Sequence, residues 1–122
     1  MKILLAEDSV LSRERETRIL QSLGHNVIPA KDGEEAIRRF ETEKPNAVIT
    51  DLEMPGMNGL EVIRSVRQHS SSVPVLVCTS SSNARLILNA LSAGANEVIP
   101  KPMDFERVQK ILAKFTPASP KG

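Results

Sequence analysis

The chain has 122 residues, of which 40% are hydrophobic and 25% charged, the size and balance of one compact domain. Its formal net charge is +1 and its basic residues are spread along the chain, which argues against direct binding to nucleic acid or to an anionic membrane. The single cysteine, Cys78, excludes an intrachain disulfide framework and a cysteine-based zinc site; with no signal peptide or long apolar run, it favours the cytoplasm.

The first predicted strand is Lys2–Ala6, a mostly apolar run that ends at the acidic pair Glu7-Asp8. A helix follows, for which Ser9 or Ser12 provides the N-cap and Gly24 the C-terminal stop. We expect the apolar face of this helix to consist of Val10, Leu11, Ile19, Leu20 and Leu23. The side that faces water is expected to consist of Arg13, Glu14, Arg15, Glu16 and Arg18. Asn26–Ala30 is a second short strand, and Asp32-Gly33 then opens a helix with an inner stripe of Ala36, Ile37 and Phe40.

The central predicted strand, Ala47–Ile49, is apolar without alternation, which is typical of a parallel strand buried on both faces. It leads to Asp51, and the stretch Met54–Gly59 that follows contains a Pro-Gly turn and a glycine that opens the next helix. The last two predicted strands are Val73–Cys78, with Thr79 at its end, and Glu97–Pro100, which ends at Lys101-Pro102.

The helices on either side of the last strand are predicted to be amphipathic. The first of them has an expected inner stripe of Ala84, Ile87, Leu88 and Leu91. Leu86 lies off that stripe, and we hypothesise that it belongs to a partner-binding patch. Asp104 caps the final helix, whose predicted inner residues are Phe105, Val108, Ile111, Leu112 and Phe115. We assign residues 1–115 to one domain and residues 116–122 to a flexible C-terminal tail or the start of a linker.

Strands that alternate with helices predict an α/β fold, a doubly wound five-stranded parallel sheet with helices on both faces. Among the common strand orders, 2-1-3-4-5 places the reversal of winding between the first and third strands, where such sheets bind their ligands. The crevice would then open between Glu7-Asp8 and Asp51, with Thr79 and Lys101 at the same edge of the sheet.

Three carboxylates at this edge repel one another by roughly a kcal/mol or more per pair, and one lysine offsets only part of that repulsion. We therefore expect a bound cation, and because the donors are all oxygen, Mg²⁺ or Mn²⁺ is favoured over zinc. A carboxylate beside a divalent cation, with an ammonium and a hydroxyl near it, fits acceptance of a phosphoryl group. Asp51 would be the nucleophile, while Lys101 and Thr79 would hold phosphoryl oxygens.

Together these residues resemble the receiver domain of two-component response regulators, a chemotaxis-regulator-like single domain with the flavodoxin-like (βα)5 fold. The resemblance covers nearly the whole chain in the family's order, through Glu7-Asp8, Asp51 with Met54–Gly59, Thr79, Gly94-Ala95 and Lys101-Pro102. The strand order 2-1-3-4-5 is itself typical of chemotaxis regulators, so it is not evidence independent of the resemblance.

The resemblance implies that Asp51 takes a phosphoryl group from a histidine kinase or a histidine phosphotransfer domain. It implies Mg²⁺ held by Asp8, Asp51 and the backbone carbonyl of Glu53, with Glu7 acting through water. It also implies a cis peptide bond between Lys101 and Pro102. Output would pass through protein contacts on the fourth helix, fifth strand and fifth helix to an unidentified target, from a monomer or a phosphorylation-linked dimer. The chain would be no enzyme beyond phosphotransfer to itself and autodephosphorylation.

Two observations leave alternatives open. Val98 stands three residues before the lysine, where the family usually has a Tyr or Phe that moves inward on activation. A degenerate receiver acting as a constitutive interaction module is therefore one alternative. A Mg²⁺-dependent phosphohydrolase also forms an aspartyl phosphate, but it needs a second Asp two residues after the nucleophile, where this chain has Glu53.

Overall fold

The computed structural model describes residues 1–115; the predicted tail at residues 116–122 lies outside them. Five parallel strands form one sheet in the order β2-β1-β3-β4-β5. The strands are β1 (Lys2–Ala6), β2 (Asn26–Ala30), β3 (Ala47–Thr50), β4 (Val75–Thr79) and β5 (Glu97–Pro100). The helices are α1 (Val10–Ser22), α2 (Gly33–Glu43), α3 (Gly59–His69), α4 (Ala84–Ala93) and α5 (Phe105–Ala113). The predicted doubly wound α/β fold and its strand order are confirmed.

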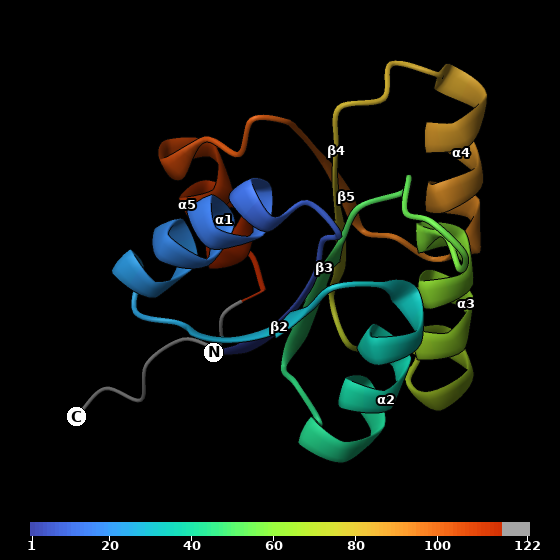
Figure 1. Ribbon diagram of the computed structural model, residues 1–122, viewed down its shortest axis with the longest axis horizontal. Coiled ribbons are helices and arrows are strands. Elements are labelled where there is room, and N and C mark those ends of the chain that lie inside the picture. The colour runs from blue at the N-terminus through green and yellow to red at the C-terminus, as the bar shows by residue number, and fades with distance from the viewer. Residues whose placement is uncertain (116–122) are drawn as a thin grey trace.

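Two layers of helices cover the sheet, with α1 and α5 on one face and α2, α3 and α4 on the other (Figure 1). Each layer has its own apolar core. Leu20, Met103 and Val108 pack against one face of the strands, whereas Ala36, Val62 and Ala90 pack against the opposite face. Within residues 1–115 no helix has the length and apolar character needed to cross a membrane.

Side-chain caps explain where the helices begin. The side chains of Ser9, Asp32, Asn58, Asn83 and Asp104 each accept a hydrogen bond from the backbone N–H three residues later. Such caps satisfy N–H groups that have no partner within the helix. Of the two candidates for the first helix, Ser9 and Ser12, the cap is Ser9, and the cap predicted at Asp104 is confirmed.

Gly59 lets α3 begin directly against the end of β3. A Cβ atom at this position would lie 2.1 Å from the backbone oxygen of Asp51 and 2.8 Å from the Cα atom of Leu52. Both neighbours are backbone atoms of the segment that carries Asp51, so they cannot move aside without shifting that residue. A glycine is therefore required here for close packing.

The predicted inner stripe of α4 is wrong, and so is the placement of Leu86 off the face that packs on the core; its membership of a partner-binding patch stays a hypothesis. Leu86 and Ala93 are partly buried against the core and Ala90 is fully buried, whereas Leu88 is 61% and Leu91 40% exposed. The spacing of residues 86, 90 and 93 is as helical as that of the stripe we expected. Because α4 carries apolar residues on several sides, counting them did not identify the face that packs on the sheet.

Three other expectations are also wrong. On α1, Val10 and Leu11 are 58% and 79% exposed, although we placed them on the apolar face, while Glu16 is buried at 2%. Phe105, at the first position of α5, is 43% exposed. The fourth strand begins at Val75 rather than Val73, since Pro74 has no N–H to donate to the sheet.

The orientation of α4 can be tested with a pair of matched truncations. We expect Leu86→Ala to lower the free energy of unfolding by roughly 1–2 kcal/mol, because it removes contacts with the core. Leu88→Ala, which truncates an exposed side chain on the same helix, should change it by less than about 0.5 kcal/mol. Urea denaturation followed by circular dichroism measures both, and equal losses would show that the helix is turned differently.

Candidate functional site

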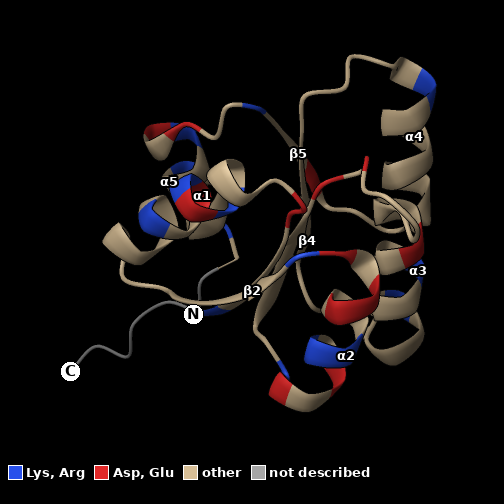
Figure 2. Ribbon diagram, viewed as in Figure 1, with Lys and Arg blue, Asp and Glu red and all other residues tan. Residues whose placement is uncertain are grey.

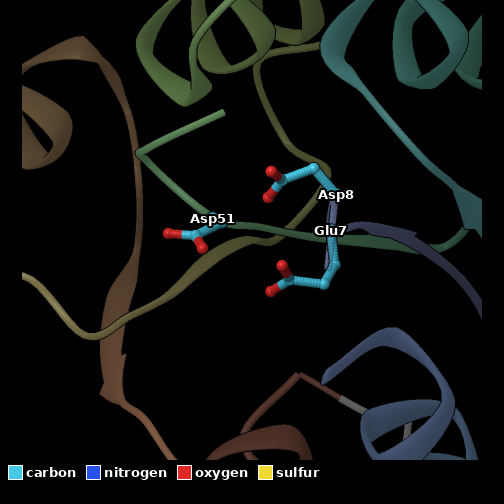
Figure 3. A group of neighbouring side chains, drawn as sticks. All are labelled: Glu7, Asp8 and Asp51. Carbon is cyan, nitrogen blue, oxygen red and sulfur yellow. The ribbon is translucent and has the colours of Figure 1, made fainter. Parts of the chain in front are cut away.

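The carboxyl ends of four adjacent strands bring the predicted site residues to one edge of the sheet. Glu7 and Asp8 follow β1, Asp51 follows β3, Thr79 ends β4 and Lys101 follows β5. Glu7, Asp8 and Asp51 each offer a carboxylate oxygen, and these oxygens lie within 4.8 Å of one another. Figure 3 shows the three side chains extending to the same side of the strand ends.

Asp51 is held by hydrogen bonds to both of its carboxylate oxygens. Its Oδ1 accepts from the backbone N–H of Leu52 at 2.7 Å and of Glu53 at 3.3 Å. Its Oδ2 accepts from Nζ of Lys101 at 2.8 Å. The hydroxyl of Thr50, which the sequence analysis did not single out, donates to the Asp51 backbone oxygen at 2.9 Å. With 6% exposure, Asp51 is a buried carboxylate held in place by these bonds rather than a surface turn residue.

Lys101 bridges two carboxylates. Besides its bond to Asp51, its Nζ donates to Oε1 of Glu7 at 2.5 Å, and its backbone N–H donates to the Thr79 oxygen at 3.0 Å. Burial lowers the pKa of Lys101, but the hydrogen bonds and negative charges of Asp51 and Glu7 outweigh burial, so the pKa is raised overall. The Lys101–Pro102 peptide bond is cis, as predicted.

The acidic pair after β1 divides into a buried and an exposed residue. Glu7 is 1% exposed, and its Oε2 accepts from the Ser9 backbone N–H at 3.0 Å. Asp8 is exposed. The guanidinium of Arg13 donates to the backbone oxygen of Glu7 at 2.7 Å, so α1 holds the loop that presents both carboxylates. Because Asp8 is exposed and Glu7 is not, Asp8 is the residue of this pair that is better placed to ligate an ion directly.

Thr79 is buried and connects the site to α4. Its Oγ1 accepts from the backbone N–H of Ser81 at 3.1 Å, and Oγ of Ser81 accepts from Asn83 at 3.2 Å. Asn83 in turn caps α4 through the backbone N–H of Leu86. The hydroxyl that we predicted to hold a phosphoryl oxygen therefore also shapes the loop between β4 and α4.

Two other residues singled out in the sequence have clear positions. The side chain of Glu53 is exposed, and only its backbone N–H is shown bonded to Asp51. Val98 is half-buried on β5 beside Val77 and packs against the core on the sheet face that α2, α3 and α4 cover (Figure 1). A valine at this position fills core space where the family usually has an aromatic ring.

Sequence reasoning missed Glu16, which we expected to face water. It is buried behind the site, and its Oε2 lies 3.9 Å from Sγ of Cys78. A signal was available, because Glu16 lies four residues before the buried Leu20 and therefore on the same face of α1. Its charge led us to place it on the wrong side of the helix.

The donor set of the site fits a hard divalent cation. The candidate ligand atoms of Glu7, Asp8 and Asp51 are all carboxylate oxygens, and the Lys101 ammonium that pairs with Glu7 and Asp51 carries one positive charge against three negative ones. Elsewhere on the molecule, lysine and arginine segments alternate with acidic segments along α1 and α2 (Figure 2), so the acidic cluster is a local feature.

Comparisons with known proteins point in one direction. The model of the "Response regulator receiver domain" family matches residues 3–113. The response regulator MprA of Mycolicibacterium vanbaalenii is 35% identical over 121 residues, 96% of this chain and 52% of that protein. The two-component response regulator PhoP of Pseudomonas aeruginosa is 36% identical over 112 residues, 92% of this chain and 50% of that protein. The chain thus spans about half the length of the curated relatives it matches.

Solved structures agree with these relatives. The chemotaxis protein CheY4 of Vibrio cholerae superposes with a TM-score of 0.87 at 29% identity, covering 94% of this chain and 98% of that one. The receiver domain of a sensor histidine kinase from Pseudomonas aeruginosa, solved with a magnesium ion coordinated in its active-site cleft, superposes with a TM-score of 0.86 at 29% identity, covering 93% and 95%. On these matches and on the geometry of the strand ends, the chain belongs to the family of response regulator receiver domains.

Proposed function

We propose that the protein is a phosphorylation-dependent signalling switch that accepts a phosphoryl group on Asp51 from a histidine kinase or a histidine phosphotransfer domain. The observation that carries this proposal is the contact between Oδ2 of Asp51 and Nζ of Lys101 at 2.8 Å, beside two further carboxylates. An ammonium at this place can neutralise charge on a phosphoryl group attached to the neighbouring carboxylate.

The chemistry is an in-line displacement. A carboxylate oxygen of Asp51 forms the new O–P bond, the P–N bond of the donor phosphohistidine breaks, and the imidazole leaves with the electron pair and takes a proton. Lys101 then holds one phosphoryl oxygen by charge and the Thr79 hydroxyl donates to another. The backbone N–H groups of Leu52 and Glu53 keep the Asp51 carboxylate in place during this exchange.

Mg²⁺, or the similar Mn²⁺, would be held by Asp8, Asp51 and the backbone carbonyl of Glu53, with Glu7 acting through water. When bound, the ion supplies positive charge for the phosphoryl oxygens. The burial of Glu7 at 1% and the exposure of Asp8 support an indirect role for Glu7 and a direct one for Asp8. The magnesium ion described for the related receiver domain of the Pseudomonas aeruginosa kinase favours Mg²⁺ for this chain also.

The signal would leave through protein contacts on the face of α4, β5 and α5. The exposed apolar residues Leu88, Leu91 and Phe105 lie on two of these elements. The downstream protein is unidentified, and the protein would act as a monomer or a phosphorylation-linked dimer without binding nucleic acid or a membrane itself. Its place in the cytoplasm stays a prediction.

The alternatives fit less well. A constitutive interaction module would not need Lys101 bonded to two carboxylates at the strand ends, and Val98 is the one observation in its favour. A phosphohydrolase would need a second Asp two residues after Asp51, where the exposed Glu53 stands. We therefore propose that the protein is no enzyme beyond self-phosphotransfer and autodephosphorylation.

The acceptor residue can be identified by intact-protein mass spectrometry. With acetyl phosphate and Mg²⁺ we expect the wild type to gain the mass of one phosphoryl group and Asp51→Asn to gain none, because the amide is no nucleophile. Asp104→Asn is the matched control, since Asn caps a helix as well as Asp does. An unmodified wild type with bound magnesium would contradict the proposed function.

The metal ligands can be separated by calorimetric titration with Mg²⁺. We expect Asp8→Asn to weaken Mg²⁺ binding by about tenfold or more, because it removes one charged oxygen ligand. Glu53→Gln should leave the affinity within about twofold, since only the backbone carbonyl of this residue is proposed as a ligand. The reverse ranking of the two variants would show that the Glu53 side chain, not Asp8, binds the ion.

A further inference from the structure

Glu16 carries a buried polar atom that nothing in the site chemistry explains. Among the side-chain oxygen and nitrogen atoms of residues 1–115, its Oε1 is the buried one without a hydrogen-bond partner. The other oxygen, Oε2, meets only the weak thiol donor of Cys78 at 3.9 Å. Burying a carboxyl oxygen without a hydrogen-bond partner lowers the stability of the folded protein, so a functional role for Glu16 would explain why it is buried here.

The charged groups that follow β1, β3 and β5 lie close enough to Glu16 to shift its pKa. Burial raises the pKa of Glu16 most, and the negative charges of Glu7 and Asp51 raise it further, to about 7, against the opposing charges of Lys101 and Arg15. Burial and the nearby Glu16 charge raise the pKa of Cys78, so its thiol stays protonated. Glu16 thus changes between a neutral acid and a carboxylate near neutral pH.

Glu16 and Lys101 line one pocket. It has a volume of about 320 Å³ and is bordered by α1 and by the segments that follow β4 and β5, through Leu11, Ser12, Arg15, Glu16, Ser80, Lys101 and Pro102. The ammonium of Lys101 has three N–H groups, and within residues 1–115 two of them have acceptors, in Glu7 and Asp51. Glu16 and Lys101 therefore border the same space, and one N–H of the ammonium is not taken up by Glu7 or Asp51, so the charge of Glu16 can act on the ammonium across the pocket.

We propose that Glu16 is a positioning residue for phosphoryl acceptance at Asp51, acting through the Lys101 ammonium with which it shares this pocket. The inference rests on the proposed function. As a carboxylate, Glu16 draws the ammonium toward the pocket and adds a negative charge behind the site, both of which oppose an incoming phosphoryl group. As a neutral acid, Glu16 does not attract the ammonium, which then binds Glu7, Asp51 and the phosphoryl oxygens.

The effect of Glu16 ionisation on the Lys101 ammonium can be measured by NMR on the metal-free protein, without any phosphoryl transfer. We expect the ¹⁵N resonance of the Lys101 ammonium to shift between pH 5.5 and 8.5 with a midpoint near the pKa of Glu16, about 7. The shift should be absent in Glu16→Gln. It should persist in Glu14→Gln, which makes the same chemical change at an exposed position of α1. If the buried amide of Gln prevents folding, Glu16→Met offers an apolar side chain of similar length.

If Glu16 acts on the site in this way, the rate of phosphorylation of Asp51 should depend on pH. At saturating Mg²⁺ and acetyl phosphate, the initial phosphorylation rates of wild type and Glu16→Gln should be equal near pH 6. Near pH 8 the variant should be about fivefold faster, the size of effect expected of one unit charge at intermediate dielectric. Glu14→Gln should follow the wild type at both pH values.

The outcomes separate the two proposals. A wild type that takes up no phosphoryl group overturns the proposed function, and with it the role of Glu16 in phosphoryl acceptance. A Lys101 resonance that ignores pH overturns the link between Glu16 and the ammonium, even if phosphorylation occurs. A rate ratio that stays constant from pH 6 to 8, in a protein that is phosphorylated, shows that Glu16 is only a structural residue.

Discussion

The ammonium of Lys101 is shared between two buried carboxylates, and the geometry of the site depends on that sharing. Glu7 and Asp51 come from different strands, and two carboxylates this deeply buried would repel each other without the cation between them. The bridge therefore ties the ends of β1, β3 and β5 together at the edge of the sheet. It also presets the ammonium beside Asp51, where the proposed chemistry needs a positive charge, so that little rearrangement is required when a phosphoryl group arrives.

The site could be predicted because it depends on where strands end rather than on how side chains pack. In a parallel sheet all strands run in the same direction, so the residues that follow them gather at one edge. Asp51, Thr79 and Lys101 could be placed together from the apolar runs before them, and the structure brings them to that edge. The role of the Glu53 carbonyl as a metal ligand rested on family resemblance alone and stays a prediction.

The faces of the helices could not be predicted as well, for a physical reason. A short helix such as α4 carries apolar side chains in more than one stripe, and only the tertiary packing decides that Leu86 turns inward and Leu88 outward. Glu16 shows the opposite failure, since a charged residue was assumed to be exposed although its spacing from Leu20 placed it inside. Sequence patterns assign burial by residue type, and residues that violate the pattern are expected at functional sites.

Thr79 offers a route from the site to α4 that does not need an aromatic ring at position 98. A hydroxyl can accept one hydrogen bond while it donates another, so Thr79 can bond a phosphoryl oxygen and still hold the Ser81 N–H. Any movement of Oγ1 toward Asp51 then pulls on the loop through Ser81 and on the cap that Asn83 forms for α4. Under the proposed function, this chain of hydrogen bonds would connect phosphorylation to the exposed face of α4, while Val98 stays half-buried against the core.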